Sequence, residues 1–484
     1  MLRLTRTLFL VLPLVAVTGR LPALAQEPST QVRFVSDENL PQAIDDCGCS
    51  ACTCCAHESF WTRARLTGDW HGIRPCLQQS GVMFRGDVTQ FAFGVDGGIN
   101  NPTLPPLLPL GEGNVFKYTG RGKYDFLIDL EKFGGLPQGN LLVGLQHWWG
   151  EYGNVSLNAG TLSPPVFAAA LPVVPDDPGV PFCTDFLFTQ PLSEKLVVFA
   201  GKKNVVGAAD QDIFAGGDGT DQFVNQALVA NPAFLLALPY SSFTAGAAMP
   251  RDWGMMSAFV FDPEDRTDEF FSRLGDLFSK GIIVGGEIKV NTNFLAKPGE
   301  HHVGALWKHI DLIDLSASPQ PAPNYPGYPY PPAPPGVPSK PDSYTIYYGF
   351  DQYLRVLPGQ RPGLGPRKRP RGWGLFGRAS ISDGNPTPYR YFLSAGIGGD
   401  SPAGCHRGDT FGVGWFYNGV SNEFGPILQN AFGPIDGTGV ELYYNFQVTP
   451  WLNVTPDIQF IRPGLAGIAT DEAFVYGLRV NMKL

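Results

Sequence analysis

The last eleven residues, Phe474–Leu484, read FVYGLRVNMKL and decide the fold. Apolar residues occupy every second position of this run, and Arg479, Asn481 and Lys483 stand between them. A period of two residues is typical of a β-strand, because successive side chains point to opposite faces. A tilted strand of about 9–11 residues can cross a bilayer. We therefore predict a membrane-spanning strand with one apolar and one polar face.

Two nearby segments, Val440–Thr449 and Leu452–Phe460, alternate as clearly, and twelve others do so less purely. Those twelve run at residues 82–93, 123–131, 141–149, 196–202, 242–249, 256–261, 281–290, 301–310, 344–355, 374–382, 389–398 and 410–417. A soluble sandwich would turn its apolar faces toward a shared core, whereas a large barrel turns them toward lipid. Long strands with such polar opposite faces favour the barrel. We predict an all-β transmembrane antiparallel barrel, with an exported sandwich as the alternative.

The composition supports this choice of class. The 59 glycines and 45 prolines make about a fifth of the 484 residues, which suits many strands joined by irregular loops rather than helices. A formal net charge of −9 offers no field that attracts phosphates, so we expect no nucleic-acid partner. After the first residues no apolar run approaches the ~20 residues of a membrane helix.

The N-terminus has the features of an export signal. Arg3 and Arg6 precede the apolar run Leu8–Val17, and Ala23-Leu24-Ala25 fits a signal-peptidase site. We predict a cleavable signal peptide over residues 1–25 and a cysteine-rich tail over residues 26–65. The tail holds five cysteines that suit either disulfides or soft-metal thiolates, and disulfides to Cys76, Cys183 or Cys405 are among the options. The five are Cys47, Cys49, Cys52, Cys54 and Cys55.

Proline marks the longest predicted loop. Pro319–Pro341 holds eleven prolines in 23 positions, and a sheet cannot incorporate such a run because proline lacks a backbone donor. We expect a stiff external loop with polyproline II geometry. Between predicted strands, Asp218–Leu236 reads as a short helix that ends, or restarts, at Asn231-Pro232.

Motifs of known enzyme and metal chemistry do not occur in the chain. The sequence has no G-x-S-x-G elbow, no Walker loop, no H-E-x-x-H helix and no EF-hand spacing. His301 and His302 are adjacent and would point to opposite faces of a strand, which disfavours a shared metal. We therefore predict no catalytic residue, no metal site and no cofactor.

The segment Leu66–Gly98, LTGDWHGIRPCLQQSGVMFRGDVTQFAFGVDGG, resembles the opening of the carbohydrate-selective porins, the glucose porins of bacterial outer membranes. The likeness continues through Gly372–Asn385 (GWGLFGRASISDGN) and the closing run Val440–Gly464 (VELYYNFQVTPWLNVTPDIQFIRPG). It covers Leu66 to the end. The resemblance implies a 16-stranded antiparallel barrel over residues 66–484, although the length also permits eighteen strands, and passive diffusion of monosaccharides such as glucose.

Three features depart from the family pattern: the cysteine-rich tail, the Pro319–Pro341 insert and a final Leu484 in place of an aromatic residue. The last weakens the expected signal to the barrel-assembly machinery. The resemblance implies small neutral sugars and outer-membrane lipid as partners, and it leaves open monomer or homotrimer. The alternatives are a general or anion-preferring porin, and a noncatalytic envelope or adhesion barrel.

A porin selects solutes by its lumen-facing side chains, so the polar faces of the predicted strands supply the candidate site. Arg378 and Arg390 are of special interest, because both are expected to point into the lumen while Tyr389, Tyr391 and Leu393 face lipid. The eleven candidates for the sugar channel are Lys123, Asp125, Asp129, Gln146, Lys202, Glu287, Arg378, Arg390, Asp457, Gln459 and Arg479.

Overall fold

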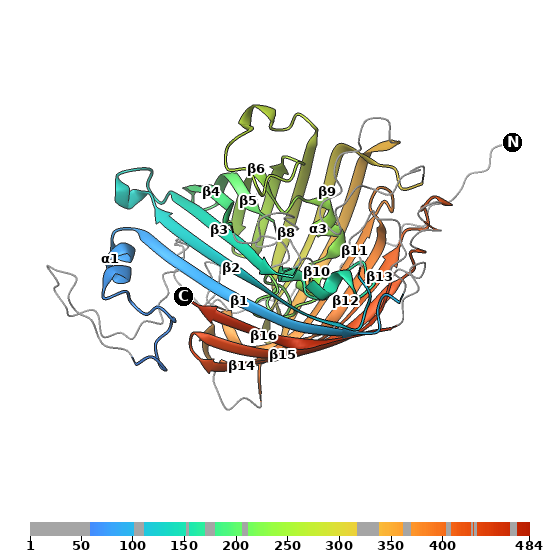
Figure 1. The fold of residues 1–484 in the computed structure, drawn as a ribbon. Coiled ribbons are helices and arrows are strands. Elements are labelled where there is room, and N and C mark those ends of the chain that lie inside the picture. Colours follow the sequence, from blue (N-terminus) through green and yellow to red (C-terminus); the bar gives the residue numbers. More distant parts are fainter. Residues whose placement is uncertain are drawn as a thin grey trace.

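The fold is a closed antiparallel β-barrel (Figure 1). The computed structural model describes residues 59–100, 111–151, 154–169, 180–205, 212–316, 338–361, 369–402, 408–426, 429, 433–464 and 472–484. Within these ranges sixteen strands form one sheet, in which each strand pairs with its neighbours along the chain and β1 pairs with β16. The predicted class and the family's strand number are confirmed, and the sandwich is excluded.

The strands are β1 Val82–Asp96, β2 Val115–Asp129, β3 Asn140–Gly150, β4 Phe182–Ser193, β5 Leu196–Asn204, β6 Ser241–Arg251, β7 Gly254–Phe261, β8 Ile282–Phe294, β9 Lys297–Ile313, β10 Ser339–Arg361, β11 Arg369–Ser382, β12 Tyr389–Asp400, β13 Thr410–Val420, β14 Gly437–Thr449, β15 Leu452–Arg462 and β16 Ala473–Lys483. The helices among the described residues are α1 Ile73–Gln79, α2 Gln226–Val229 and α3 Pro232–Ala237, with 3₁₀ turns η1 Glu131–Phe133, η2 Asn154–Leu157, η3 Phe167–Ala169 and η4 Leu274–Asp276.

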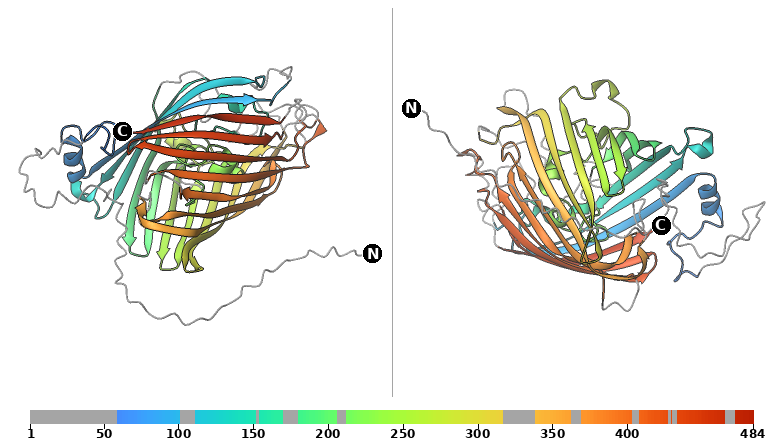
Figure 2. Two further views of the ribbon diagram at one scale, coloured as in Figure 1. Left: turned by 90° about the horizontal axis from the view of Figure 1, so that it is seen from below. Right: turned by 180° about the vertical axis from the view of Figure 1, so that it is seen from behind.

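The two ends of the barrel differ in their connections. Short connections such as residues 194–195, 252–253 and 295–296 join strands at one end, where α1 and the C-terminus also lie (Figure 2). Long connections, among them residues 205–240 and 262–281, join strands at the other end. In outer-membrane barrels the short turns face the periplasm and the long loops face outward. We use short-turn end and long-loop end for these two rims.

Alternating residues face opposite environments, as the sequence pattern predicted. On β14, Leu442 is 44% exposed on the outer surface, while its neighbour Glu441 is fully buried on the inner side. The exposed apolar residues of β8 to β16, such as Trp307 and Phe460, share this outer surface. A barrel with an apolar exterior and a polar interior is the arrangement that a bilayer requires.

Strand β4 is the one strand that the periodicity did not reveal. Its sequence, FCTDFLFTQPLS, pairs with β3 through an irregularity between Gly144 and Leu145 and with β5 through another beside Pro191. Each irregularity shifts the alternation by one position. Counting every second residue along the sequence therefore no longer separates the inner face of the strand from its outer face.

The predicted helix over Asp218–Leu236 was partly wrong. The helical turns begin only at Gln226, because residues 212–225 form a succession of turns and bends whose backbone groups bond to the barrel wall. The break was predicted correctly: Asn231 caps α3, accepting from the backbone N–H of Ala233 at 3.1 Å, and Pro232 occupies the first turn.

Residues 26–58 of the tail and most of the proline-rich insert lie outside the described residues. The end of that insert needs a correction, since β10 begins at Ser339 and includes Pro341 beside a register shift. A register shift near the end of a strand accommodates proline, which has no backbone N–H group to donate. Cys76 is in a disulfide whose partner lies outside the described residues, and Cys183 is a free thiol. None of the described helices is long and apolar enough to span a membrane.

Candidate functional site

The connection between β5 and β6 folds back into the barrel. Its described part, Asp212–Tyr240, is called the inner loop below. Its helix α3 contacts strands β9 to β12, and α2 contacts β13, so the segment reaches across the lumen from its own strands. The β3–β4 connection joins it there: the backbone N–H of Phe167 donates to the Val224 carbonyl at 3.0 Å, and that of Gln226 donates to the Pro164 carbonyl at 3.0 Å.

Buried arginines of the wall hold the inner loop by its carbonyl groups. Arg378 on β11 donates to the carboxylate of Asp212 at 2.7 Å and to the carbonyls of Ala215 and Leu228 at 2.6 and 2.8 Å. Arg479 on β16 donates to the carbonyls of Gly219 and Gln222 at 3.0 and 2.7 Å. A guanidinium group offers five donors in a fixed fork, which suits an irregular segment with several unpaired carbonyls.

Wall carboxylates bind the backbone donors of the same loop. Asp351 on β10 accepts from the N–H groups of Ile213 and Phe214 at 2.8 and 3.2 Å. Glu441 on β14 accepts from those of Val224 and Asn225 at 2.6 and 2.9 Å. These contacts supply partners for backbone groups that would otherwise be buried without hydrogen bonds.

Aromatic packing completes the attachment. The Phe223 ring lies edge-on to Phe376 and Tyr443, with ring centroids 5.4 and 4.9 Å apart, and it has no exposed surface. The inner loop is therefore a packed part of the structure: β10 to β16 hold its hydrogen bonds, and its Val229 and Leu238 share a second buried cluster with apolar residues of β3 and β7 to β10. The charged residues that stay partly exposed beside the loop lie on β2, β5, β8 and β9.

These charged side chains stand in pairs, and all of them except Asp185 keep partial contact with solvent. On β2 to β5, Lys123 lies 3.9 Å from Asp125, and Lys203 lies 2.8 Å from Asp185. On β8 and β9, Lys289 lies 2.9 Å from Glu300. We call these six residues, together with Glu287, the charged wall. The Lys123 side chain is 23% exposed, whereas that of Arg378 is 1% exposed.

The inner loop contributes one carboxylate to this wall. Asp218 lies 2.9 Å from Arg121 and 3.5 Å from Lys123. Burial alone would raise its pKa, but the charges of Arg121 and Lys123 outweigh burial and lower the pKa below its usual range. Asp218 therefore stays ionised and fixes the near edge of the inner loop beside the charged wall.

Tyr240 and Gln146 secure the end of the inner loop. The Tyr240 hydroxyl donates to Gln146 at 2.9 Å, and Gln146 also accepts from Arg121 at 3.1 Å. Burial raises the pKa of Tyr240 to about 12, which keeps its hydroxyl protonated as a donor.

The structure distributes the eleven sequence candidates over four places. Lys123, Asp125 and Glu287 belong to the charged wall. Near the inner loop and buried are Gln146, Arg378, Asp457, Gln459 and Arg479. At the rims lie Asp129, which accepts from the N–H of Glu131 at the short-turn end, and Arg390, 3.6 Å from Glu423 at the long-loop end. Lys202 lies on the outer surface.

The position of Lys202 corrects the assignment of the polar face of β5. Lys202 stands opposite Phe186 and Phe243, and its ammonium group is buried under residues 262–281, where it donates to the carbonyls of Thr267 and Glu269. The neighbouring Lys203 points into the lumen and binds Asp185. With two consecutive lysines, the sequence alone does not show which of them faces the lumen. The predicted run, residues 196–202, also ended before Lys203.

Arg378 and Arg390 both lie on the inner face, but at different heights. Arg378 pairs with Ser394 of β12, four residues from Arg390, which is about 13 Å along a strand. Tyr389 does not face lipid as expected. A register shift between Tyr389 and Tyr391 turns the Tyr389 ring inward, where its hydroxyl lies 3.4 Å from that of Ser163.

Sequence reasoning missed four of the seven residues of the charged wall, Asp185, Lys203, Lys289 and Glu300, and also Arg121 and Asp218 beside it. Asp185 lies on the unrecognised strand β4, and Arg121 lies before the predicted start of β2. Lys289 lies within the predicted run 281–290, on the same face as Glu287, and Glu300 lies one residue before the predicted run 301–310. Asp218 was assigned to a helix, and no local pattern shows that its segment enters the lumen.

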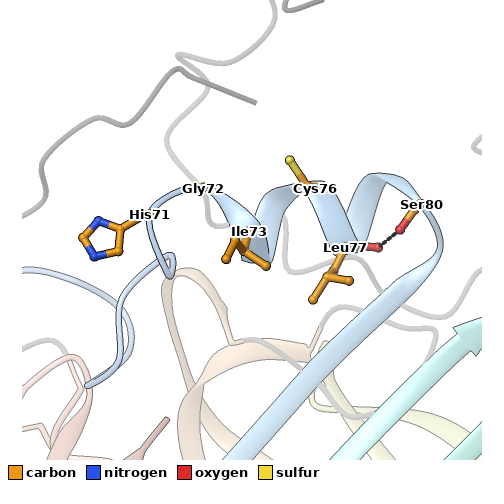
Figure 3. Close-up of a pocket in the computed structure, with 6 residues that line it drawn as sticks. All are labelled: His71, Gly72, Ile73, Cys76, Leu77 and Ser80. Atoms are coloured by element: carbon orange, nitrogen blue, oxygen red, sulfur yellow. Dashed lines mark hydrogen bonds between the residues drawn. The ribbon is translucent and has the colours of Figure 1, made fainter. Parts of the chain in front are cut away.

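A second hollow lies outside the barrel at the short-turn end (Figure 3). It is lined by His71, Gly72, Ile73, Cys76, Leu77 and Ser80. Ser80 donates to the Leu77 carbonyl at 2.9 Å. None of the lining residues is Asp, Glu, Lys or Arg, so the surface of the hollow offers little to a polar solute. Among the residues that the structure describes, no group of three or more His, Cys, Asp or Glu side chains is placed to hold a metal ion.

Comparison with known proteins gives matches over most of the chain. The model of the carbohydrate-selective porin, OprB family, matches residues 114–484. A high-pH structure of Pseudomonas putida OprB is 19% identical, with a TM-score of 0.67 over 88% of this chain and 100% of that chain. A low-pH structure of the same protein is 15% identical, with a TM-score of 0.50 over 88% of this chain and 99% of that one. No curated protein sequence matches.

Proposed function

Because the chain belongs to the carbohydrate-selective porin family, OprB, we propose that small sugars such as glucose diffuse through it across the bacterial outer membrane. Members of this family are channels, so no residue is assigned a catalytic role. The observation that carries the proposal is the charged wall, where donors and acceptors stand side by side and, apart from Asp185, remain partly exposed.

The sugar path runs along β2 to β9, between the charged wall and the inner loop. A sugar hydroxyl both donates and accepts hydrogen bonds, so it needs a surface with both kinds of group. Lys123 beside Asp125 and Lys203 beside Asp185 provide such pairs at 3.9 and 2.8 Å. Between the two charged groups, strands β6 and β7 present small or apolar inner residues such as Ala248 and Ser257, suited to the C–H faces of a sugar ring.

Pairing of charges favours neutral solutes over ions. Each lysine of the charged wall has a carboxylate partner within 4 Å, so the wall has no large field of one sign. This arrangement disfavours the anion-preferring alternative. Of the sequence candidates, Lys123, Asp125 and Glu287 contact the sugar in this proposal, whereas Gln146, Arg378, Asp457, Gln459 and Arg479 set the width of the path by holding the inner loop.

The location follows from the family and the fold. Outer-membrane lipid surrounds the apolar exterior, residues 1–25 direct export, residues 26–65 form the tail, and the barrel-assembly machinery inserts residues 66–484. Whether the barrel acts alone or as a trimer does not alter the path, which lies inside one chain.

Sugar flux into proteoliposomes tests the function. We expect purified protein to accelerate the entry of glucose strongly and the entry of a trisaccharide much less. Protein-free vesicles give the baseline rate. A narrow path bounded by the inner loop should exclude the larger sugar. Equal acceleration of mono- and trisaccharides would support a general pore instead, and no acceleration of either would contradict the proposal.

A further inference from the structure

The β7–β8 connection, residues 262–281, lies against the outer surface of the barrel and is called the outer loop below. Its Phe271 ring lies 5.0 Å from that of Phe186 and 6.0 Å from that of Phe243, measured between centroids. These two residues stand opposite Lys202 in the sheet, on the face that points away from the lumen. The outer loop therefore covers the exterior of β4 to β6.

The strands beneath this loop are the ones that most need a cover. Strand β5 has nine residues and β7 has eight, at or below the roughly 9–11 that a tilted strand needs to cross a bilayer. The outer face of β5 also carries Lys202, two residues before its end at the long-loop rim. A lysine on the lipid-facing side of a barrel is costly unless its charge is covered.

The outer loop buries one cluster of charged groups against the wall, whereas its Asp268, Arg273, Asp276 and Lys280 are exposed. The guanidinium of Arg266 has no exposed surface, and it binds Asp262, Glu264 at 2.9 Å and Glu269 at 3.1 Å. The carbonyls of Thr267 and Glu269 accept from Lys202. These contacts fix the loop to the wall and satisfy the buried charges.

Apolar side chains of the same loop point outward. Phe270 is 56% exposed, Leu274 47% and Phe278 39%. Strand β8 starts directly after the loop, and its outer residues Val284 and Ile288 are exposed in the same way. The exposed apolar surface of the loop thus continues the lipid-facing surface of the barrel toward the long-loop rim.

We propose that the outer loop is a membrane-contacting element that completes the short lipid-facing wall of β4 to β7 and packs against the outer leaflet. Its partner is lipid acyl chain, not a second copy of the chain, because its exposed apolar residues Phe270, Leu274 and Phe278 continue the membrane-facing belt and its Arg266 cluster is buried against the wall. The inference needs a membrane-inserted barrel but is independent of which solute passes through the lumen.

Site-specific photo-crosslinking in lipid vesicles tests this contact. The variant Leu274→benzoylphenylalanine, in full-length protein reconstituted in vesicles with radiolabelled phosphatidylcholine, should label lipid on irradiation. The matched positive control carries the same substitution at Ile288, an exposed outer residue of β8, and the negative control carries it at Trp61, which is 67% exposed on the segment before α1. Each substituted position is exposed, so folding should be retained, and heat-modifiable migration on gels verifies it.

The expected result is lipid labelling at position 274 comparable to that at position 288 and at least several-fold above that at position 61. Labelling at position 274 no higher than at position 61 would overturn the proposal. A crosslink at position 274 that yields a dimer instead of labelled lipid would overturn it as well, because the partner would then be a second copy. The variant Phe270→benzoylphenylalanine tests lipid labelling at a second position of the same surface.

Discussion

Replacing Arg378 with alanine is expected to widen the channel more than any other single substitution of a wall residue. The side chain holds Asp212, Ala215 and Leu228 together, and its removal takes from the buried Asp212 carboxylate and from two carbonyls the donor that Arg378 supplies, leaving Asp212 with His302 at 3.6 Å. Breaking a buried ion pair in this way costs about 3–5 kcal/mol. The inner loop should then detach locally, so that single-channel conductance rises and trisaccharides enter proteoliposomes nearly as fast as glucose.

Arg390→Ala is the matched control for this experiment. The same side chain is removed from the neighbouring strand, but Arg390 is exposed at the long-loop rim and touches Glu423 at 3.6 Å instead of the inner loop. Its conductance and sugar discrimination should stay close to those of the parent protein. Equal effects of Arg378→Ala and Arg390→Ala, or no effect of the former in folded protein, would show that the inner loop does not define the width.

The double variant Lys123→Ala, Lys203→Ala is expected to make the channel strongly cation-preferring. Both lysines neutralise carboxylates of the charged wall, and their loss leaves Asp125 and Asp185 uncompensated, while Asp218 keeps only Arg121. A unit charge about 5 Å from a passing ion contributes roughly 1–3 kcal/mol. The permeability ratio of potassium to chloride should rise about five-fold or more, measured as the reversal potential in a salt gradient.

Lys202→Ala serves as the control for charge, since it removes an adjacent lysine of the same strand. Because Lys202 lies on the outer surface beneath the outer loop, its removal should leave the reversal potential unchanged. A shift as large as that of the double variant would mean that the lumen-facing side of β5 has been assigned wrongly.

The sequence was sufficient for the barrel because lipid and water impose opposite polarities on alternate residues. In β14 to β16 this pattern is undisturbed, and the predicted faces agree with the structure. It failed where the alternation is shifted, as in β4 and at Tyr389, because a bulge changes which residues face inward without changing composition. The phase error at Lys202 has a related origin: two adjacent lysines fit either face.

The candidate site was less accessible to prediction for a different physical reason. Inner-face polarity is the same whether a side chain meets water or a folded-back loop, so Arg378 and Lys123 look alike in sequence. Their difference arises from the inner loop, whose position depends on hydrogen bonds between residues more than 100 positions apart, such as Asp351 with Ile213. No local periodicity encodes such contacts, and polar faces alone therefore gave a mixture of path residues and loop-anchoring residues.

Single-channel recording with glucose titrated into the bath tests the central claim most directly. Purified protein in a planar bilayer should form discrete channels, and glucose should reduce their current in a saturable manner, because a sugar bound beside the charged wall occupies the ion path. A current that falls only in proportion to solution viscosity, or an absence of channels from folded protein, would contradict the account.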